Sequence, residues 1–393
     1  MKPADRLRIA IVGPTHPYKG GVAAHTTQLA SRLEAAGHEV SLVSWSRLYP
    51  VILYPGEQRM PAGSRDVPAF ARTSWPLTWY SPRSWWRTGR SLTGNDLVIL
   101  VMLIPAQIPA LMTLTKAFRG SGSRRKRGNG RVIVLAHNVR PHEAQPAGDR
   151  LVSALVRVAD GVLVHSPEMS GQASDLGARR VSSAPLPPHL PGGCPTPQKR
   201  SELLSLRAAH RATGRPLRIL CLGIVRHYKG VDLLLEAVRS HPHVHVTVAG
   251  EQWGEAGRRV CELAEEPDLR GRVQVFSGYV PAEQVPDLLR DHDVVALPYR
   301  SATASQNVLL AHAYGLPVLA SRVGTFPEQV RDGVDGLLIT PSDVGAISKA
   351  IDRLKEPTTM EELVRNVPEP DLDGPWHTYV RAVEEMHYDM RRR

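Results

Sequence analysis

The sequence predicts a protein of two α/β domains, each built on a parallel β-sheet that helices cover on both faces. The length of 393 residues is about that of two ordinary domains. Short, continuous apolar segments alternate with longer helical segments along the whole chain, as they do in parallel sheets that are buried on both faces. In addition, residues 7–22 and 217–232 align with each other without a gap.

The apolar segments that we expect to form strands fall into two groups. The first group comprises residues 7–13, 38–45, 96–103, 131–138 and 161–166. The second group comprises residues 217–223, 244–250, 272–278, 293–298, 316–321 and 335–340.

Pro and Gly are dense between the two groups, in APLPPHLPGGCPTPQKR (184–200), and this composition is typical of a linker. We therefore predict an N-terminal domain over residues 1–186 and a linker over 187–214. A C-terminal domain over 215–372 and a final helix over 373–393 complete the predicted order.

The internal repeat places the same pattern of residues at the start of each domain. Identical residues recur at Leu7/Leu217, Arg8/Arg218, Ile9/Ile219, Gly13/Gly223, Tyr18/Tyr228, Lys19/Lys229 and Gly20/Gly230. Each domain is thus expected to open with a strand, a glycine loop and a helix. Ligands of such sheets bind at the carboxyl ends of the strands.

The chain is basic, with 49 Lys and Arg against 38 Asp and Glu and a formal net charge of +11. This balance favours anionic partners such as nucleotides or anionic lipids. The basic residues Arg124, Arg125, Lys126 and Arg127 cluster in the Gly/Ser-rich segment 119–131, which is either a solvated loop or a contact with anionic lipid. Nucleic acid is not expected as a partner, because no aromatic-interleaved basic motif accompanies the cluster.

Three widely spaced cysteines form neither a disulfide framework nor a zinc motif, so a reducing compartment such as the cytoplasm is expected. The N-terminus leads directly into a strand, without a signal peptide. The uncharged segment 97–115 approaches the length of a membrane span, but Pro105 and Pro109 interrupt it. A strand, a loop and a helix are the better prediction there.

An aromatic segment, SWPLTWYSPRSWWRTGRS (74–91), combines Trp75, Trp79, Trp85 and Trp86 with several arginines. Trp favours membrane interfaces and Arg favours anionic headgroups, whereas a buried aromatic cluster under a loop would have the same composition. Trp also stacks on sugar rings. Together with the basic segment, these residues favour a lipid-linked or membrane-proximal glycan acceptor, with the protein peripheral on the inner face of the plasma membrane.

The segment 302–322 contains no Asp or Glu. Small polar residues instead lead into a helix there: Thr303, Ser305, Gln306 and Asn307. Such residues at a helix start are typical of an anion site.

Four segments resemble the GT-B glycosyltransferases, and specifically family-4-like enzymes that use nucleotide-diphosphate sugars. They are THPYKGGVAAHTTQLASRLEAAGHEVSLVS (15–44), LAHNVRPHE (135–143), GIVRHYKGVDLLLEAV (223–238) and GLPVLASRVGTFPEQVRDGVDGLLITPSD (315–343). The second of these resembles a subgroup with an HNVxPHE motif. The resemblance implies two Rossmann-like domains facing across a cleft, with a C-terminal helix that crosses back to the first domain.

The resemblance also implies catalytic roles for His137, Arg226 and Lys229. Lys229 would neutralise the departing diphosphate, and His137 would contact the donor sugar. The family normally has an Arg five residues before this Lys, where this chain has Ile224, so we infer that Arg226 substitutes. Alternatively, Arg226 and Lys229 belong to an ordinary surface loop, and His137 is an ordinary core histidine at a strand end. Glu143 is a candidate for the base that activates the acceptor.

The residues that the resemblance assigns to the donor are Gly20, Gly21, Gly250, Glu251, Tyr279, Val280, Thr303, Ser305, Gln306, Asn307 and Glu328. Two family glutamates are missing, because Ala302 and Leu310 occupy their positions. The site is therefore either repurposed or holds the diphosphate and sugar through neutral hydrogen bonds, which we favour.

The predicted function is transfer of a sugar from a nucleotide-diphosphate sugar to a glycan or lipid-linked acceptor in bacterial polysaccharide or glycolipid assembly. The resemblance implies that the transfer retains the configuration of the sugar. No cofactor and no metal are expected. The alternatives are a pseudo-glycosyltransferase or sugar-nucleotide epimerase on the same fold, and a non-catalytic GT-B scaffold.

Overall fold

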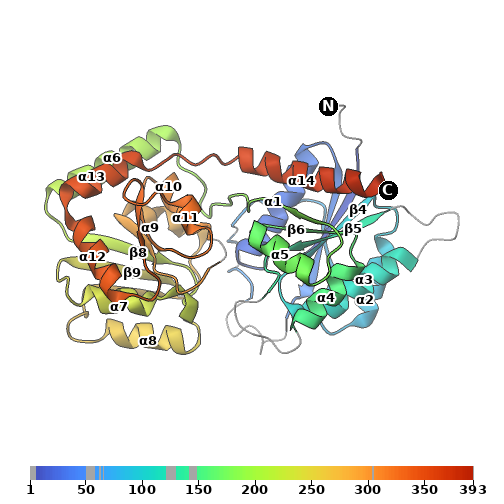
Figure 1. Cartoon of the computed structure of the whole chain (residues 1–393), viewed down its shortest axis with the longest axis horizontal. Helices are drawn as coiled ribbons and strands as arrows, with labels where there is room; N and C mark the ends of the chain where they lie inside the picture. The colour runs from blue at the N-terminus through green and yellow to red at the C-terminus, as the bar shows by residue number, and fades with distance from the viewer. Residues whose placement is uncertain are drawn as a thin grey trace. The chain divides into compact units, whose positions relative to one another are not determined.

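The computed structural model describes residues 6–49, 58–61, 63–64, 66–120, 130–140, 148–302 and 305–392. The chain divides into two compact units, one of residues 1–189 with 372–393 and one of residues 190–371 (Figure 1).

The first unit contains a seven-stranded sheet in the order β3-β2-β1-β4-β5-β6-β7, with parallel pairing throughout. Its strands are β1 (Arg8–Val12), β2 (Glu39–Arg47), β3 (Thr73–Thr78), β4 (Leu97–Met102), β5 (Arg131–Ala136), β6 (Gly161–Val164) and β7 (Val181–Ser183). Its helices are α1 (Gly21–Ala35), α2 (Pro82–Ser91), η2 (Pro105–Gln107), α3 (Ile108–Gly120), α4 (Gly148–Val158), α5 (Pro167–Asp175) and α14 (Gly374–Arg391).

The second unit contains a six-stranded parallel sheet in the order β10-β9-β8-β11-β12-β13. Its strands are β8 (Leu217–Leu222), β9 (Val244–Gly250), β10 (Val273–Ser277), β11 (Val294–Leu297), β12 (Val318–Ser321) and β13 (Gly336–Ile339). Its helices are α6 (Pro197–Ala212), η3 (His227–Lys229), α7 (Val231–Val238), α8 (Gly254–Ala264), η4 (Ala282–Gln284), α9 (Val285–Arg290), α10 (Asn307–Ala313), α11 (Phe326–Gln329), α12 (Val344–Lys355) and α13 (Pro357–Asn366).

The two sheets share one strand order, and the internal repeat occupies the same place in both. β1 and β8 are each third from an edge, and each leads through a glycine loop into a helix, α1 or α7. The strand order reverses between β1 and β4 in the first unit and between β8 and β11 in the second. The prediction of two Rossmann-like α/β domains is confirmed, and ligands of such sheets bind at these reversal points.

The first sheet is buried on both faces, and the C-terminal helix covers part of one of them. Along β1, Ala10 and Val12 belong to one core cluster, while Ile9 and Ile11 belong to another. Trp376 and Tyr379 of α14 pack in the second of these clusters. The predicted final helix therefore crosses back and completes the core of the first unit, as the resemblance implied.

The uncharged segment 97–115 forms β4, η2 and the first part of α3, as predicted. Across the part of the chain that the structure describes, no helix combines the length and the apolar character needed to cross a membrane.

Two strands and one helix differ from the sequence-based expectations. β3 and β7 lie at the two edges of the first sheet, where Pro76 is tolerated in β3 and β7 is only three residues long. Helix α6 lies inside the segment predicted as a linker over 187–214. Its N-terminus is capped by the Thr196 hydroxyl, which accepts a hydrogen bond from the Lys199 N–H at 3.2 Å.

A buried arginine fixes α6 to the second unit. The Arg207 side chain is fully buried and donates hydrogen bonds to the carbonyl oxygens of Leu289, His292 and Tyr314 at 2.7, 3.1 and 2.5 Å. Burial lowers the pKa of Arg207 to about 10, because the dehydrated cation is disfavoured. α6 is thus part of the second unit.

Replacing this arginine is expected to destabilise the second unit. Arg207→Met removes three donors and leaves three buried carbonyls unpaired, at about 1–3 kcal/mol each, so we expect a loss of roughly 3 kcal/mol or more. Urea unfolding measures the loss, with the exposed Lys199→Met on the same helix as control. Equal midpoints for the two variants would contradict the structural role of Arg207.

Candidate functional site

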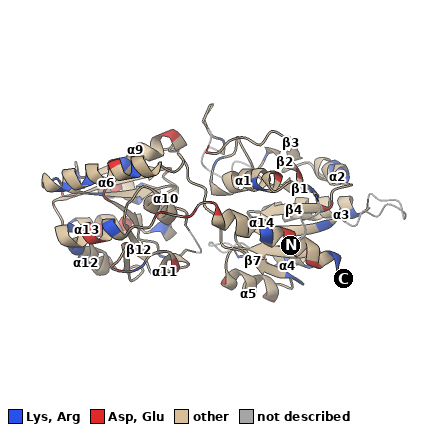
Figure 2. Ribbon diagram, turned by 90° about the horizontal axis from the view of Figure 1, so that it is seen from above, with Lys and Arg blue, Asp and Glu red and all other residues tan. Residues whose placement is uncertain are grey.

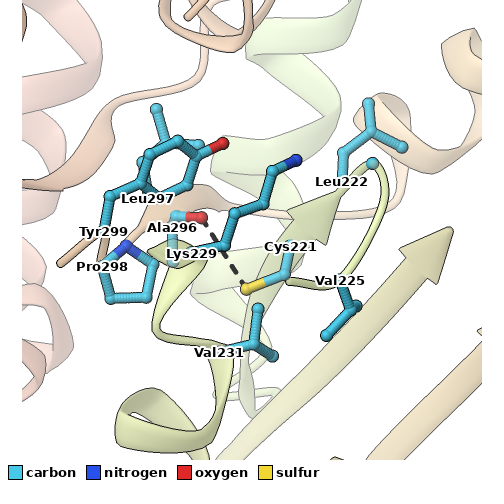
Figure 3. A pocket seen from close by; sticks show the side chains of 10 residues that line it. Cys221, Leu222, Val225, Lys229, Val231, Ala296, Leu297, Pro298 and Tyr299 are labelled. Atoms are coloured by element: carbon cyan, nitrogen blue, oxygen red, sulfur yellow. Dashed lines mark hydrogen bonds between the residues drawn. The ribbon is translucent and has the colours of Figure 1, made fainter. Parts of the chain in front are cut away.

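A small pocket lies at the carboxyl ends of β8 and β11. The parallel register of these strands, Val294 with Ile219 and Val295 with Leu220, brings their ends to the same edge of the sheet. The lining residues are Cys221, Leu222, Gly223, Val225, Lys229, Val231, Ala296, Leu297, Pro298 and Tyr299 (Figure 3). This is the strand-order reversal point of the second unit.

Lys229 is the one basic side chain in this otherwise apolar lining. Its Nζ lies 5.6 Å from the centre of the Tyr299 ring, and the two side chains lie next to each other in Figure 3. Burial lowers the pKa of Lys229, because a dehydrated ammonium is disfavoured. An anion bound beside it would offset that cost.

An ion pair holds the segment that carries Lys229. The Arg300 guanidinium, just after β11, donates to both Asp232 carboxylate oxygens at 2.9 and 2.6 Å and to the His227 carbonyl at 2.7 Å. Burial alone would raise the pKa of Asp232, but the hydrogen bonds and charge of Arg300 hold it below its usual value. Arg300 thereby anchors the chain at the start of η3, through His227, and just after its end, through Asp232.

Gly230 ends η3 in the left-handed conformation, with φ of 61°, and a Cβ there would collide with the Pro298 carbonyl. A similar approach occurs between the ends of β8 and β9, where a Cβ on Gly250 would collide with the Gly223 backbone. These two glycines allow the loops at the pocket to pack against each other.

Arg226 lies on the aromatic face of Trp253, with its guanidinium 4.4 Å from the ring centre. Trp253 in turn donates a hydrogen bond to the Glu251 carboxylate at 2.9 Å. The Arg226 charge contributes to the lowered pKa of Lys229, so the two predicted cations lie near each other. The predicted site residues Arg226, Lys229, Gly250 and Glu251 therefore gather at one edge of the sheet.

The polar loop before α10 is tied to the same pocket. The Asn307 side chain donates to the Leu222 carbonyl at 2.9 Å, and its backbone N–H donates to the Ser305 hydroxyl at 3.3 Å. Burial raises the pKa of the Tyr299 phenol, against a hydrogen bond with Ser305 that lowers it. Gln306 forms the N-cap of α10.

The two positions of the missing glutamates differ in their surroundings. Leu310 is only 1% exposed and belongs to the core side of α10, whereas Ala302 is half-buried in the preceding loop. A carboxylate at position 310 would therefore be buried without water.

The remaining predicted donor residues of the second unit also follow strand ends. Tyr279 and Val280 are half-buried after β10, and Glu328 is exposed on α11 after β12. Thr303, Glu143 and the basic residues Arg124, Arg125, Lys126 and Arg127 lie outside the described residues.

The glycine pair of the first unit stands at the start of α1. Gly20 is the N-cap, with φ of 101°, and Gly21 is the first helical residue. A Cβ on Gly21 would lie 3.2 Å from the His189 ring, so the glycine lets the helix approach this histidine.

His137 is half-buried and belongs to a cluster of histidines that lie far apart in the sequence. Its Nδ1 is 3.1 Å from His165 Nε2, and its ring meets that of His25 edge-on at 4.9 Å. His137 follows β5, His165 follows β6 and His25 lies on α1. Among the described residues, His137 Nε2 and both nitrogens of His25 are buried without a hydrogen-bond partner.

Helix α14 closes this cluster. The Trp376 ring stacks on His25 at 5.3 Å, and the Tyr379 ring stacks on His165 at 5.8 Å. Burial, followed by the influence of neighbouring histidines, lowers the pKa of His25 and His137 well below the usual value. The cluster is therefore neutral at neutral pH.

The four predicted interface tryptophans do not share one environment. Trp75, Trp79 and Trp86 are exposed, at 44%, 41% and 42%. Trp85 instead packs against the core and donates to the Thr78 carbonyl at 2.7 Å. Trp85 is half-buried and thus less available to an acceptor or a membrane than the other three, and its role at such a surface stays a prediction.

Residues 205–368 match the family model described as "Glycosyl transferases group 1". The matched range covers nearly all of the second unit, including the pocket with Lys229.

A curated relative, the D-inositol 3-phosphate glycosyltransferase of Mycobacterium sp. (strain KMS), is 35% identical over 162 residues. This alignment covers 39% of the chain and 36% of the relative, so the chain matches about a third of the length of that protein.

Solved structures extend the likeness of the fold to both units. Sucrose-phosphate synthase from Thermosynechococcus elongatus is 20% identical, with a TM-score of 0.67 and 98% of each chain covered. HepE of Anabaena, in complex with UDP and glucose, is 16% identical, with a TM-score of 0.67 and 98% and 99% of the two chains covered. The chain shares their two-unit α/β architecture, consistent with the GT-B fold.

The buried histidines are expected to make the first unit unstable in acid. Burial lowers the pKa of His165 and His189 to about 4, from the usual 6.5. The unfolded chain binds more protons between these values, so the free energy of unfolding falls as the pH drops from 6.5 toward 4, by up to about 3 kcal/mol per histidine.

Urea unfolding between pH 7.5 and 4.5 tests this expectation. The double change His165→Gln and His189→Gln should flatten the pH profile relative to the parent. The exposed His377→Gln on α14 is the matched control and should keep the parent slope. Identical slopes for all three chains would show that these histidines are not buried in the neutral form.

Proposed function

We propose that this protein transfers a sugar, with retention, from a nucleotide-diphosphate sugar to a glycan or lipid-linked acceptor. The setting would be bacterial polysaccharide or glycolipid assembly in the cytoplasm, at the inner face of the plasma membrane. The proposal rests chiefly on Lys229, a half-buried cation at the strand-order reversal point within the segment that matches group 1 glycosyl transferases.

The chemistry of the leaving group is the reason for giving Lys229 this weight. Departure of a nucleoside diphosphate builds negative charge, which a fixed cation in a dry site stabilises. Arg226 would add a second positive charge, held by its contact with Trp253. The reaction would use no metal, because metal-dependent transferases employ acidic pairs and the sequence 302–322 has none.

The names of the relatives agree with this chemistry. The curated relative is named a glycosyltransferase, and HepE was solved with UDP and glucose. A donor of the same class fits the polar and glycine loops that follow β8, β9 and β11 in this chain.

In the first unit, His137 would contact the donor sugar as a neutral imidazole. Its hydrogen bond to His165 fixes the ring, so His165 would act as a positioning residue. The unpartnered Nε2 of His137 is the atom left for a sugar hydroxyl.

The missing glutamates support a second candidate function. A pseudo-glycosyltransferase or an epimerase on this fold would bind the same donor without making a glycosidic bond. A non-catalytic scaffold would bind no donor. We favour transfer, with Ser305, Gln306 and Asn307 supplying neutral hydrogen bonds, at the cost of weaker ribose anchoring.

Binding of nucleoside diphosphates tests the donor site directly. UDP, ADP and GDP are each titrated in a thermal-unfolding assay, where a ligand at 100 times its Kd stabilises by about 2.7 kcal/mol. Stabilisation by at least one of them is expected. No shift with any of the three would exclude a donor site and favour the scaffold.

Lys229→Ala is expected to lower turnover by about 10²-fold or more, since it removes a preorganised charge from the transition state. Measurement is by release of nucleoside diphosphate, with thermal unfolding as the check on the fold. Lys349→Ala, an exposed lysine of α12, is the control and should keep parent activity. An unchanged rate in Lys229→Ala would contradict the assignment of the diphosphate to this pocket.

A further inference from the structure

Helix α2 presents one exposed face that carries three arginines and a tryptophan. Arg83, Trp86, Arg87 and Arg90 follow the spacing i, i+3, i+4 and i+7, and all four are exposed. The opposite face is committed to packing, since a Cβ on Gly89 would lie 2.6 Å from the Leu114 carbonyl oxygen of α3.

The turn between β3 and α2 adds two exposed aromatic residues to this face. Trp79 and Tyr80 are in edge-on contact at 5.4 Å, and Tyr80 is 52% exposed. The Arg47 guanidinium lies 5.8 Å from the Tyr80 ring centre. Large aromatic side chains gathered at the surface indicate an interaction site rather than a solvated face.

The charge of this surface is of one sign. From residue 67 to 95 the sequence contains four arginines and no Asp or Glu. Arg72 pairs with Glu34 of α1 at 2.5 Å, whereas Arg83, Arg87 and Arg90 form no ion pair within the described residues. Figure 2 shows the basic positions of α2 in blue.

We propose that Trp79, Tyr80, Arg83, Trp86, Arg87 and Arg90, the β3–α2 surface, dock the protein onto a bilayer that contains anionic lipids. Guanidinium groups bind lipid phosphates, and Trp and Tyr insert at the level of the headgroups. A neutral glycan would also stack on the aromatic rings, but it carries no charge to pair with the three arginines, whereas lipid phosphates do. The proposal rests on the membrane setting proposed above, which it assigns to named residues, and it is tested without turnover.

Vesicle co-sedimentation provides the test, with phosphatidylcholine vesicles that contain or lack 30% phosphatidylglycerol. At about 1 kcal/mol per arginine, Arg83→Ser, Arg87→Ser and Arg90→Ser together should weaken binding to anionic vesicles about 10²-fold. Trp79→Ser with Trp86→Ser should also weaken binding. Arg381→Ser with Tyr388→Ser, an exposed pair of α14, is the matched control and should bind as the parent does.

Quenching of tryptophan fluorescence by brominated lipid reports contact separately. The extent of quenching should be smaller in Trp79→Ser with Trp86→Ser than in the parent. Far-UV circular dichroism and the thermal midpoint should stay unchanged. A fourth variant changes Arg124, Arg125, Lys126 and Arg127 to Ser.

Parent-like vesicle binding in both surface variants would overturn the proposal. So would loss of vesicle binding only in the variant of Arg124, Arg125, Lys126 and Arg127, because binding would then reside in that segment. Loss of affinity for a soluble oligosaccharide in the tryptophan variant, with unchanged vesicle binding, would assign the surface to a glycan instead.

Discussion

The parallel pairing of β8 with β11 is the constraint on which the candidate donor site depends. It brings Leu222 and Pro298 to one edge of the sheet, where the strand order reverses. The loops at this edge pack closely because Gly230 leaves room for the Pro298 carbonyl. Arg300 then ties the loop after β11 to Asp232 at the start of α7. Lys229 is thereby held in the pocket by the backbone geometry around it rather than by a carboxylate of its own.

The same strand order gives the first unit a different chemistry. The ends of β5 and β6 carry neutral imidazoles instead of a lysine, since His137 and His165 follow these neighbouring strands. Helix α14 returns from the end of the chain and stacks Tyr379 on His165 and Trp376 on His25 of the same cluster. Lys19 and Lys229 are thus equivalent in the internal repeat, and Lys229 is the one placed in the pocket between β8 and β11.

The sequence predicted the elements that are buried on both faces, because continuous apolar runs mark them. All eleven predicted strands are present, whereas β3 and β7 were missed because edge strands need no such run. Helix α6 was missed because the Pro-rich stretch before it led us to predict a linker. At the candidate site, Lys229 and Arg226 were predicted from the family resemblance and stay predictions, whereas His25, His165 and Arg300 were not predicted. These three residues contact others that are far away in the chain, and no local sequence pattern predicts such contacts.

The structure also gives a physical reason for the absence of a glutamate at position 310, where the family that the chain resembles has one. Leu310 is buried in the second unit, so a carboxylate there would lack water. Asn307 donates a hydrogen bond to the Leu222 carbonyl, and Ser305 forms one with Tyr299. These bonds anchor the polar loop to the end of β8. A loop that is held in this way needs no acid for its own position. Any donor bound there would meet neutral groups on one side and Lys229 on the other, so its affinity would depend on the diphosphate more than on the ribose.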